Sequence, residues 1–175
     1  MAKLVEQNPE NPREFRDVMG QFPTGVAVVC TSSPNGQPQG FTISSFTSLS
    51  LTPPLVAFNL KETSPSLKHL RQNGCFSINV LDSTQGDLST HFATSQPDKF
   101  GNVEWHSGAI LRQPLILQAM ATFECRLWQE YAGGDHVIVV GAVKAMASRT
   151  DRVPLVFHRG RYACLMNQAG ESSQQ

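Results

Sequence analysis

Residues 40–55 of this chain read Gly40-Phe41-Thr42-Ile43-Ser44-Ser45-Phe46-Thr47-Ser48-Leu49-Ser50-Leu51-Thr52-Pro53-Pro54-Leu55. The polar positions of this stretch are small hydroxyls set among large apolar side chains, a pattern that predicts a half-buried strand. We expect this strand to end at the Pro53-Pro54 break and a second apolar strand to follow. Such a strand suits a flat aromatic ligand, because backbone groups and hydroxyls bond ring heteroatoms while apolar neighbours cover the ring face. An ordinary Ser/Thr-rich edge strand is the alternative, and this segment alone does not separate the two.

Outward from this stretch, short apolar runs alternate with glycine-rich turns. Strands are expected over 26–31, 55–60, 76–81, 122–130, 137–146, 155–158 and 162–165, and short helices over 13–20, 65–73 and 87–93. The alternation of apolar and polar residues in 76–81 indicates a strand with one buried face. This succession predicts a mainly β fold, a barrel or a sandwich with a few short helices. We expect a single domain over 1–175, with flexible tails at 1–12 and 167–175.

Composition limits the classes of function. The 175 residues carry zero formal net charge and no basic block, so electrostatic binding of nucleic acid is not expected. No apolar run reaches the roughly 18 residues of a membrane helix, and the N-terminus lacks the layout of a signal peptide, so a cytoplasmic protein is expected. The four cysteines are far apart and form no C-x-x-C pair, which predicts buried thiols and no metal site.

Several common nucleotide-binding and catalytic motifs are absent from the sequence. There is no G-x-G-x-x-G after a strand, no P-loop and no G-x-S-x-G elbow. A Rossmann nucleotide domain is therefore not expected.

A candidate anion site precedes the expected helix at 65–73. Ser64 is placed as the N-cap of this helix and Pro65 as its first residue. The free N–H groups of the helix start, together with the hydroxyls of Thr63, Ser64 and Ser66, are suited to a phosphate. A simple capped surface helix is the alternative.

A second candidate is the turn Gly133-Gly134-Asp135-His136, whose glycines let a ligand approach the backbone. The ring of His136 at the rim is suited to stack on or hydrogen-bond a ligand, and Asp135 is suited to fix its tautomer. A generic hairpin turn is the alternative. Arg159 and Arg161 on the last hairpin are candidates for binding the phosphates of a ligand, although exposed turn arginines are common.

Three segments in order resemble the flavin reductase-like family of FMN-binding split-barrel proteins. The first, Phe15-Arg16-Asp17-Val18-Met19-Gly20-Gln21-Phe22-Pro23-Thr24-Gly25-Val26, resembles the opening of that family. The stretch from Phe41 to Leu55 resembles its flavin-ring strand, and Gly134-Asp135-His136 resembles its nicotinamide-site motif. The resemblance extends from about Phe15 to Leu165. It implies a split β-barrel, often the small reductase component of a two-component flavin-dependent monooxygenase.

The resemblance also implies roles for individual residues. The residues expected to bind cofactor are Phe41, Thr42, Ser44, Ser45, Lys61, Ser64, Ser66, Phe92, Ala93, Lys99, Gly134, Asp135, His136 and Arg161. Thr42, Ser44 and Ser45 are expected to support charge at the N1–O2 edge of the flavin ring. Ser64 and Ser66 are expected to hold the phosphate, with Lys61 or Lys99 as a nearby cation. Phe92 and Ala93 are expected near the flavin.

The implied activity is NAD(P)H-dependent reduction of flavin, by hydride transfer from nicotinamide C4 to flavin N5, with His136 as the catalytic residue that places the nicotinamide. The flavin is expected to be FMN, or else FAD, and the nucleotide NADH or NADPH. A homodimer is implied, with the reduced flavin passing to a partner monooxygenase or to another acceptor, such as ferric iron or a corrinoid. A non-catalytic flavin carrier or sensor, and an oxidase resembling pyridoxamine-phosphate oxidase, are the alternatives.

Overall fold

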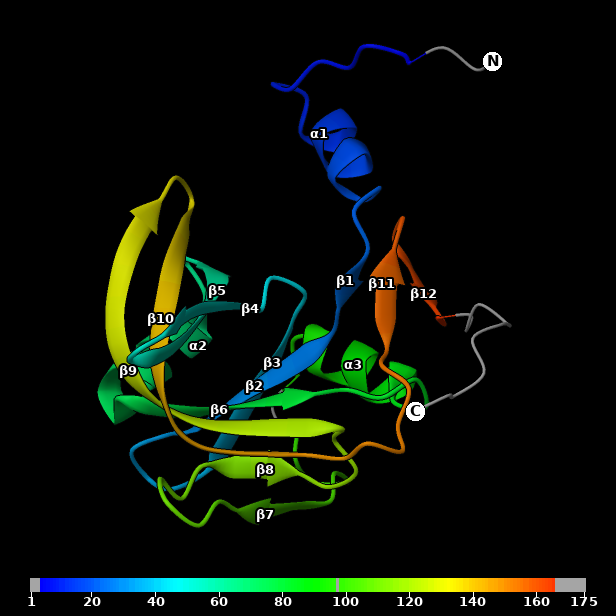
Figure 1. Cartoon of the computed structure of the whole chain (residues 1–175). Helices are drawn as coiled ribbons and strands as arrows, with labels where there is room; N and C mark the ends of the chain where they lie inside the picture. Colours follow the sequence, from blue (N-terminus) through cyan, green and yellow to red (C-terminus); the bar gives the residue numbers. More distant parts are fainter. Residues whose placement is uncertain (1–3, 97, 166–175) are drawn as a thin grey trace.

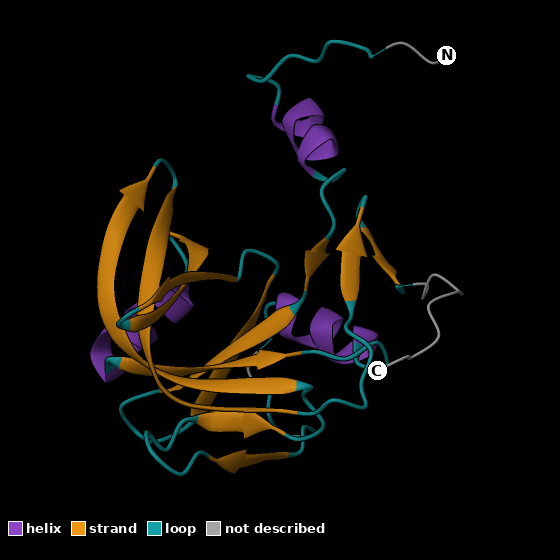
Figure 2. Ribbon diagram, in the orientation of Figure 1, coloured by secondary structure: helices purple, strands orange, loops and turns teal. Residues whose placement is uncertain are grey.

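The structure is a computed structural model that describes residues 4–96 and 98–165 (Figure 1). Strands dominate these residues, and the helices are short (Figure 2). In chain order the elements are α1 (Pro12–Met19), β1 (Thr24–Gly25), β2 (Ala27–Ser32), β3 (Pro38–Ile43), β4 (Thr47–Leu51), β5 (Pro54–Lys61), α2 (Pro65–Asn73), β6 (Cys75–Val80), α3 (Gly86–Ala93), β7 (Trp105–Ser107), β8 (Pro114–Ile116), β9 (Ala121–Gly133), β10 (His136–Ser148), β11 (Val156–His158) and β12 (Arg161–Ala163). The predicted mainly β fold is confirmed.

The largest sheet curls into a barrel because of a short link between its two edges. Seven antiparallel strands follow the order β3-β2-β6-β9-β10-β5-β4, so β3 and β4 lie at opposite edges. Only Ser44, Ser45 and Phe46 separate these strands in sequence. A link this short spans at most roughly 14 Å. The two edges therefore have to come together, as Figure 1 shows.

The prediction of one continuous strand from Gly40 to the Pro-Pro break is wrong. The chain leaves the sheet at Ser44 and re-enters it as β4. Ser45 explains the break, because its hydroxyl accepts a hydrogen bond from the backbone N–H of Asn59 at 2.9 Å and lies 3.4 Å from the carbonyl of the same residue. A serine side chain bonded to backbone in this way replaces ladder pairing.

β9 and β10 form the longest hairpin, as the apolar runs at 122–130 and 137–146 predict. Each strand has 13 residues. β10 pairs with both β9 and β5, so it lies inside the sheet. The hairpin closes where Gly133 faces His136, and this turn stands at one end of the barrel (Figure 1).

β6 differs from its predicted half-buried state, because both of its faces are covered. Ser77 and Asn79 are fully buried although they are polar. The Ser77 hydroxyl donates to the carbonyl of Pro114, and the Asn79 side-chain oxygen accepts from the N–H of Ile116 at 2.9 Å. Both acceptor and donor lie on β8, so the β7–β8 hairpin covers the polar face of β6. Buried polar groups persist when they are bonded in this way.

Two apolar clusters make up the core. The first fills the barrel and is closed at one end by Leu67 and Leu70 of α2. The second joins β2 to α3 through Val28, Phe92 and Phe100. β2 contributes to both clusters, which explains its continuous apolar sequence at 26–30.

The link from β10 to β11 is fixed by a buried ion pair. Arg152 Nη1 donates to Asp82 at 3.0 Å, and the side chain of Asp82 is almost completely buried. Burial alone raises the pKa of this carboxyl, but hydrogen bonds from Thr84 and the charge of Arg152 outweigh it and lower the pKa below the usual value.

α1 stands apart from the barrel (Figure 1). Asn11 caps it by accepting hydrogen bonds from the N–H groups of Arg13 and Glu14, but none of its residues is buried. The strand that follows, β1, pairs with β11 in a small sheet of order β1-β11-β12. Of the predicted tails, residues 4–11 form no helix or strand, while 1–3 and 167–175 lie outside the described residues.

Two sequence expectations concern the membrane and the thiols. None of the helices in the described ranges is long and apolar enough to cross a bilayer. The cysteines are all free, but only Cys30 and Cys125 are buried, whereas Cys164 is exposed. The prediction of four buried thiols is thus wrong for Cys75, which is only partly buried, and for Cys164, which follows the short edge strand β12. Residues 4–96 and 98–165 contain no group of side chains suited to a metal ion.

Candidate active site

The predicted site residues gather in two clefts at the two ends of β3. We call the first the rim cleft; its volume is about 620 Å³ and it is lined by Phe15, Ile43, Ser44, Ser45, Asn59, Gly133, His136 and Ile138. We call the second the helix cleft; its volume is about 300 Å³ and it is lined by Pro38, Gln39, Gly40, Phe41, Ser64, Pro65, Ser66, Phe92, Ala93, Thr94, Ser95, Gln96 and Lys99. β3 is the edge strand that connects them.

The rim cleft is built where the barrel edges meet. The link of Ser44 and Ser45 forms one wall, and the β9–β10 turn with His136 forms the other. Asn59 of β5 lies between them, held by Ser45. Apolar side chains of Ile43 and Ile138 complete the lining. Small hydroxyls facing apolar walls give this cleft the chemistry predicted for a flat heteroaromatic ring.

His136 is oriented by its neighbour. Its Nδ1 lies 2.7 Å from Asp135 Oδ1, and its side chain is 38% exposed. This hydrogen bond and the charge of the imidazole lower the pKa of Asp135. The bond places the Nδ1 proton toward the carboxylate, so a neutral His136 presents Nε2 as an acceptor.

The turn that carries His136 has a defined shape. Gly134 has φ of +72° at the first central position, the geometry of a type II′ hairpin turn. No atom lies within 4 Å of the place where a Cβ of Gly134 would stand, so the glycine is required for its backbone angle and not for space.

The helix cleft contains the start of α2. Ser64 is the N-cap and Pro65 the first residue, as predicted, and Gly74 ends the helix in a left-handed conformation. The Ser64 hydroxyl bonds no N–H group of the helix, and no acidic residue lies in the first turn. The positive end of the helix dipole is therefore uncompensated in this turn, which favours an anion.

Lys99 lies in the same cleft with its ammonium partly engaged. Nζ donates to the carbonyl of Phe92 at 2.8 Å and to the carbonyl of Gly40 at 3.2 Å. Burial lowers the pKa of Lys99. An ammonium has three donors, so one remains for an anion. The two bonds fix Lys99 between α3 and β3.

The floor of the helix cleft is tightly packed. Phe92 is fully buried, and its ring lies so close to Gly40 that a Cβ there would stand 2.7 Å from Cε1. Phe41 is also buried, with its ring 6.1 Å from that of Phe58 in the barrel core. Phe92 and Phe41 thus shape the cleft mainly as packed walls, with Ala93 beside them.

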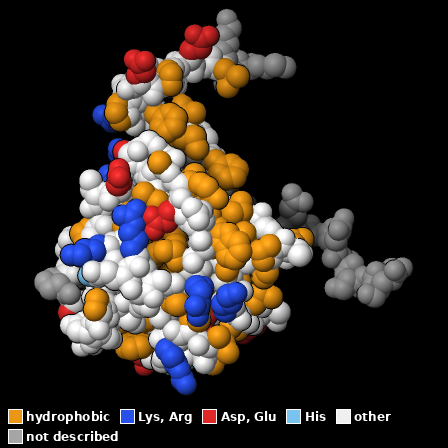
Figure 3. Space-filling view, turned by 90° about the vertical axis from the view of Figure 1, so that its left-hand side faces the viewer, with side chains coloured by type: hydrophobic (Ala, Val, Ile, Leu, Met, Phe, Trp, Pro, Cys, Tyr) orange, Lys and Arg blue, Asp and Glu red, His pale blue; other side chains and the backbone are white. Residues whose placement is uncertain are grey.

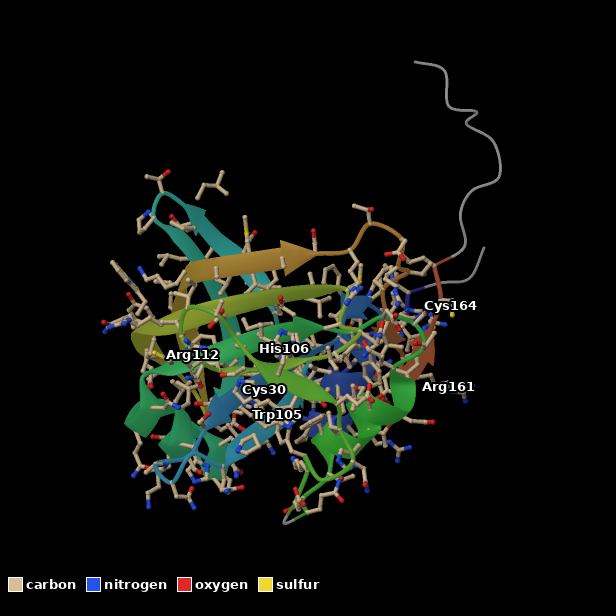
Figure 4. The ribbon with its side chains drawn as sticks, turned by 90° about the horizontal axis from the view of Figure 1, so that it is seen from below. Cys30, Trp105, His106, Arg112, Arg161 and Cys164 are labelled. Atoms are coloured by element: carbon tan, nitrogen blue, oxygen red, sulfur yellow. The ribbon has the colours of Figure 1, made fainter. Side chains whose placement is uncertain are left out.

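Five predicted residues line neither cleft: Gly134 and Asp135, which belong to the turn that carries His136, and Thr42, Lys61 and Arg161. The Thr42 hydroxyl donates a hydrogen bond to the carbonyl of Ser89 at 2.7 Å, so its only donor is already engaged in a contact between β3 and α3. Lys61 pairs with His136 in the β5–β10 register and lines neither cleft. Arg161 is exposed on β12, near Cys164 in Figure 4 and outside the lining of both clefts.

Sequence reasoning missed several lining residues. Asn59 interrupts the apolar run of β5, and that interruption is a signal that was available in the sequence. Phe15 gives no local signal, because its approach to the rim cleft depends on where α1 stands. Gln96 follows α3 and donates to the carbonyl of His91 at 3.1 Å, which only the folded loop shows.

Comparisons with known proteins show what this chain is similar to. The family model described as flavin reductase like domain matches residues 19–166. A flavin reductase of Pseudomonas putida is 38% identical over 167 residues, which is 93% of this chain and 95% of that protein. The reductase subunit HsaB of a flavin-dependent monooxygenase from Rhodococcus jostii is 38% identical over 152 residues, 87% of this chain and 77% of that protein.

Solved structures are similar over nearly the whole chain. The NADH:FAD oxidoreductase SgcE6 of Streptomyces globisporus, in complex with NAD and FAD fragments, superposes with a TM-score of 0.89 at 36% identity. That alignment covers 97% of this chain and 100% of the other. The flavin reductase PheA2 superposes with a TM-score of 0.80 at 32% identity, covering 90% and 99% of the two chains.

Proposed function

Because this chain belongs to the flavin reductase like domain family, it is a flavin reductase of the split-barrel fold, and we propose that it binds the flavin along β3 and the nicotinamide beside His136. The observation that carries this placement is the position of the two clefts at the ends of one strand. The resemblance stated from the sequence is confirmed.

The residues of the two clefts fit a flavin phosphate and ring. Ile43 in the rim cleft and Gly40 in the helix cleft lie three steps apart on β3, roughly 10 Å at the rise of a strand. A ribityl chain bridges a distance of that order. The ring would lie by Ser44 and Ser45, and the phosphate by Ser64, Ser66 and Lys99.

The bound nucleotides supply the chemistry, a hydride that leaves C4 of the nicotinamide and enters the flavin at N5. The protein supplies position. Ser44 offers a hydroxyl to the polar edge of the ring, while Ile43 and Ile138 exclude water from its face. His136, held by Asp135, orients the carboxamide of the nicotinamide through Nε2. Proximity and orientation are sufficient for the acceleration, because no proton has to move in this step.

A homodimer is the assembly that we propose. α1 has only eight residues and none of them is buried, and a helix this short is not stable alone in water. Its apolar residues Phe15, Val18 and Met19 are about half exposed. Figure 3 shows hydrophobic side chains gathered in a band that runs from this helix down onto the body. A second copy of the chain would cover that band. Sedimentation equilibrium tests this, and a monomer at micromolar concentration would refute it.

Reduced flavin would then pass to a separate monooxygenase. The support is that similar proteins are named as reductase subunits of such enzymes. We place the protein in the cytoplasm, where NADH or NADPH is available. FMN and FAD both satisfy the phosphate site.

The first test is anaerobic oxidation of NADH and of NADPH by the purified protein, with and without added FMN or FAD. Oxidation that rises with free flavin is the expected result. Flavin binding without oxidation of either nucleotide would indicate a carrier or sensor, and the role of His136 would be withdrawn.

A substitution tests the placement of the nicotinamide. His136→Ala is expected to raise the KM for the nicotinamide nucleotide with little change in flavin affinity. His106→Ala is the matched control, because His106 is also exposed but lies on β7 outside both clefts. A collapse of flavin binding in His136→Ala alone would make this histidine a flavin contact.

A further inference from the structure

A cleft beside the β7–β8 hairpin shares no lining residue with the rim cleft or the helix cleft. Its volume is about 370 Å³, and it separates this hairpin from the ends of β9 and β10. We call it the hairpin cleft. The hairpin lies at the base of the molecule in Figure 1, and Figure 4 views it from below with His106 labelled. His136 and the hairpin cleft lie at opposite ends of β10, so a ligand here stays apart from the place proposed for the nicotinamide.

Two cross-strand pairs form the walls of the hairpin cleft. His106 is opposite Leu115 in the β7–β8 register, and Thr122 is opposite Ala147 in the β9–β10 register. Residues that are opposite each other in a ladder project from the same face of their sheet, so each pair belongs to one wall. The cleft is therefore a slot between two β surfaces, a shape that suits a flat ligand.

The link from β8 to β9 closes the base of the slot and is fixed by backbone hydrogen bonds. The N–H of Leu117 donates to the carbonyl of Glu104 at 3.0 Å, and the N–H of Met120 donates to the carbonyl of Val80 at 2.9 Å. The carbonyl of Met120 also accepts from the N–H of Arg149 at 2.8 Å, which ties the base to the residue after β10. A slot held in this way exists before a ligand arrives, so binding costs little ordering of the chain.

The deep part of the slot is apolar. Leu115, Ile116 and Ala119 line it and are buried. Met120 lines it as well, and a methionine thioether makes favourable contacts with aromatic rings. These side chains, set in a flat slot, favour an aromatic ring.

The polar side chains of the slot can donate hydrogen bonds, and no aspartate or glutamate lines it. Within residues 4–96 and 98–165, no hydrogen bond or ion pair engages the guanidinium of Arg149 or the hydroxyls of Thr122 and Ser148. A carboxylate only accepts hydrogen bonds and carries the charge opposite to that of Arg149. It therefore complements this set of groups.

Gln118 adds a further donor in a fixed position. Its side-chain oxygen accepts from Arg152 Nη2 at 2.7 Å, so the N–H groups of its amide are the part left for a ligand. Its φ is +66°, in the left-handed region. A residue other than glycine keeps this conformation only where its surroundings fix it, and such positions are frequent at binding sites.

Glu124 does not compete for Arg149. It lies two residues after Thr122 on β9, hence on the same face of that strand. Its carboxyl oxygens accept the N–H groups of Ile110 and Leu111 at 3.2 and 2.5 Å, so Glu124 is engaged and buried under the loop that joins β7 to β8. The place of an anionic partner beside Arg149 is thus left to a ligand.

We propose that the hairpin cleft binds a small aromatic carboxylate, with the ring against Leu115 and Met120 and the carboxylate on Arg149 and the amide of Gln118. This site is additional to the reduction of flavin, and it does not depend on where the flavin lies. Benzoate is the simplest ligand of this class and serves as the probe.

The test is isothermal titration calorimetry of the full chain with benzoate, in the absence and in the presence of saturating FMN. A dissociation constant below about 1 mM is expected, and it should be the same with FMN. Benzyl alcohol has the same ring without the charge, so it is expected to bind at least about tenfold more weakly. Displacement of benzoate by FMN would place benzoate in the flavin clefts and overturn the proposal.

Two substitutions locate the carboxylate and the ring. Arg149→Gln is expected to weaken benzoate about tenfold, to leave benzyl alcohol unchanged and to leave NADH oxidation unchanged. Arg126→Gln is the matched control, because Arg126 is also an exposed arginine on this sheet but does not line the cleft. Ala147→Leu fills the slot from an exposed position, so it is expected to fold normally by circular dichroism and to bind neither probe.

Each contrary outcome decides against the site. Absence of benzoate binding at millimolar concentration overturns the proposal, and so does equal affinity for benzoate and benzyl alcohol. Benzoate affinity that is unchanged in Arg149→Gln, or unchanged in a folded Ala147→Leu, moves the ligand elsewhere and also overturns it. None of these results affects the proposed placement of flavin and nicotinamide, which NADH oxidation and the His136→Ala variant test separately.

Discussion

Gly40→Ala is the substitution that most directly tests how β3 is seated. A Cβ at this position would stand 2.7 Å and 2.9 Å from two atoms of the Phe92 ring and 3.3 Å from the Phe100 ring. Phe92 is fully buried between β3 and α3, so its ring has no free space into which to move. Overpacking of this kind costs about 1–3 kcal/mol, and contact with two rings places the expected loss at about 2–3 kcal/mol.

Urea unfolding followed by circular dichroism measures this loss. A loss of this size lowers the midpoint by about 1 M if the slope is about 2–3 kcal/mol per M. All variants have to be compared at one protein concentration, because a dimer makes the midpoint concentration-dependent. Flavin affinity is expected to fall in parallel, since Gly40 also lines the helix cleft and accepts a hydrogen bond from Lys99.

Two further variants make the result interpretable. Gly25→Ala is the matched control, because no atom lies within 4 Å of its Cβ position and its φ is not in the left-handed region. It is expected to be neutral or to stabilise by up to about 1 kcal/mol. Phe92→Leu in the Gly40→Ala background should restore part of the stability, because the two sites are in contact and not additive. If Gly40→Ala unfolds at the same midpoint as Gly25→Ala, the close packing of β3 on α3 is refuted.

The remaining predictions concern the phosphate site, an ion pair and a thiol. Ser64→Ala combined with Ser66→Ala is expected to weaken FMN at least tenfold in equilibrium dialysis, at roughly 1.5 kcal/mol for each lost bond to a charged group; an equal loss for riboflavin would remove the phosphate assignment. Asp82→Asn is expected to lower the unfolding free energy by about 2–3 kcal/mol at pH 7. The pKa of Asp82 is lower in the folded protein than in the unfolded chain, so the contribution of Asp82 to stability is present above the unfolded pKa of about 3.9 and is lost as the pH falls toward the folded pKa. The difference in unfolding free energy between Asp82→Asn and the unmodified protein should therefore shrink as the pH falls below about 4. A difference that stays constant over this pH range would contradict the prediction. Cys164 should react first with a thiol reagent at pH 8, whereas Cys125, whose pKa burial raises to about 12, should react only on unfolding; simultaneous reaction of both would refute the burial pattern.

The elements with strong local patterns were predictable. The long hairpin of β9 and β10 follows from two apolar runs around a glycine pair, and the helix after Ser64 follows from its N-cap, Pro65 and Gly74. Each of these signals acts within a few residues of the structure it determines. The order along the chain of the segments that contain the candidate site residues was likewise predictable from the sequence.

Features that depend on distant partners were not predictable. Nothing local at Ser45 shows that its hydroxyl bonds Asn59 and divides one expected strand into two. The alternation at Ser77 indicates an exposed face, but the β7–β8 hairpin covers it. The sequence pattern indicates a ligand-binding hydroxyl at Thr42, yet this hydroxyl donates its hydrogen bond to the backbone carbonyl of Ser89. In each case the deciding partner lies far away in sequence, so only the fold identifies it.

The edge strands β3 and β4 of the barrel are joined by a covalent link and not by inter-strand hydrogen bonds, and this affects how the barrel opens transiently. In the described residues β3 pairs only with β2 and β4 only with β5, so opening between β3 and β4 breaks no inter-strand hydrogen bond. The bond from the Asn59 N–H to Ser45 is the contact that such opening would release. We therefore expect the amide of Asn59 to exchange with solvent deuterium faster than amides in the middle of β10. The gap that opens borders the rim cleft, which gives a large planar ligand a way in without unfolding of the sheet.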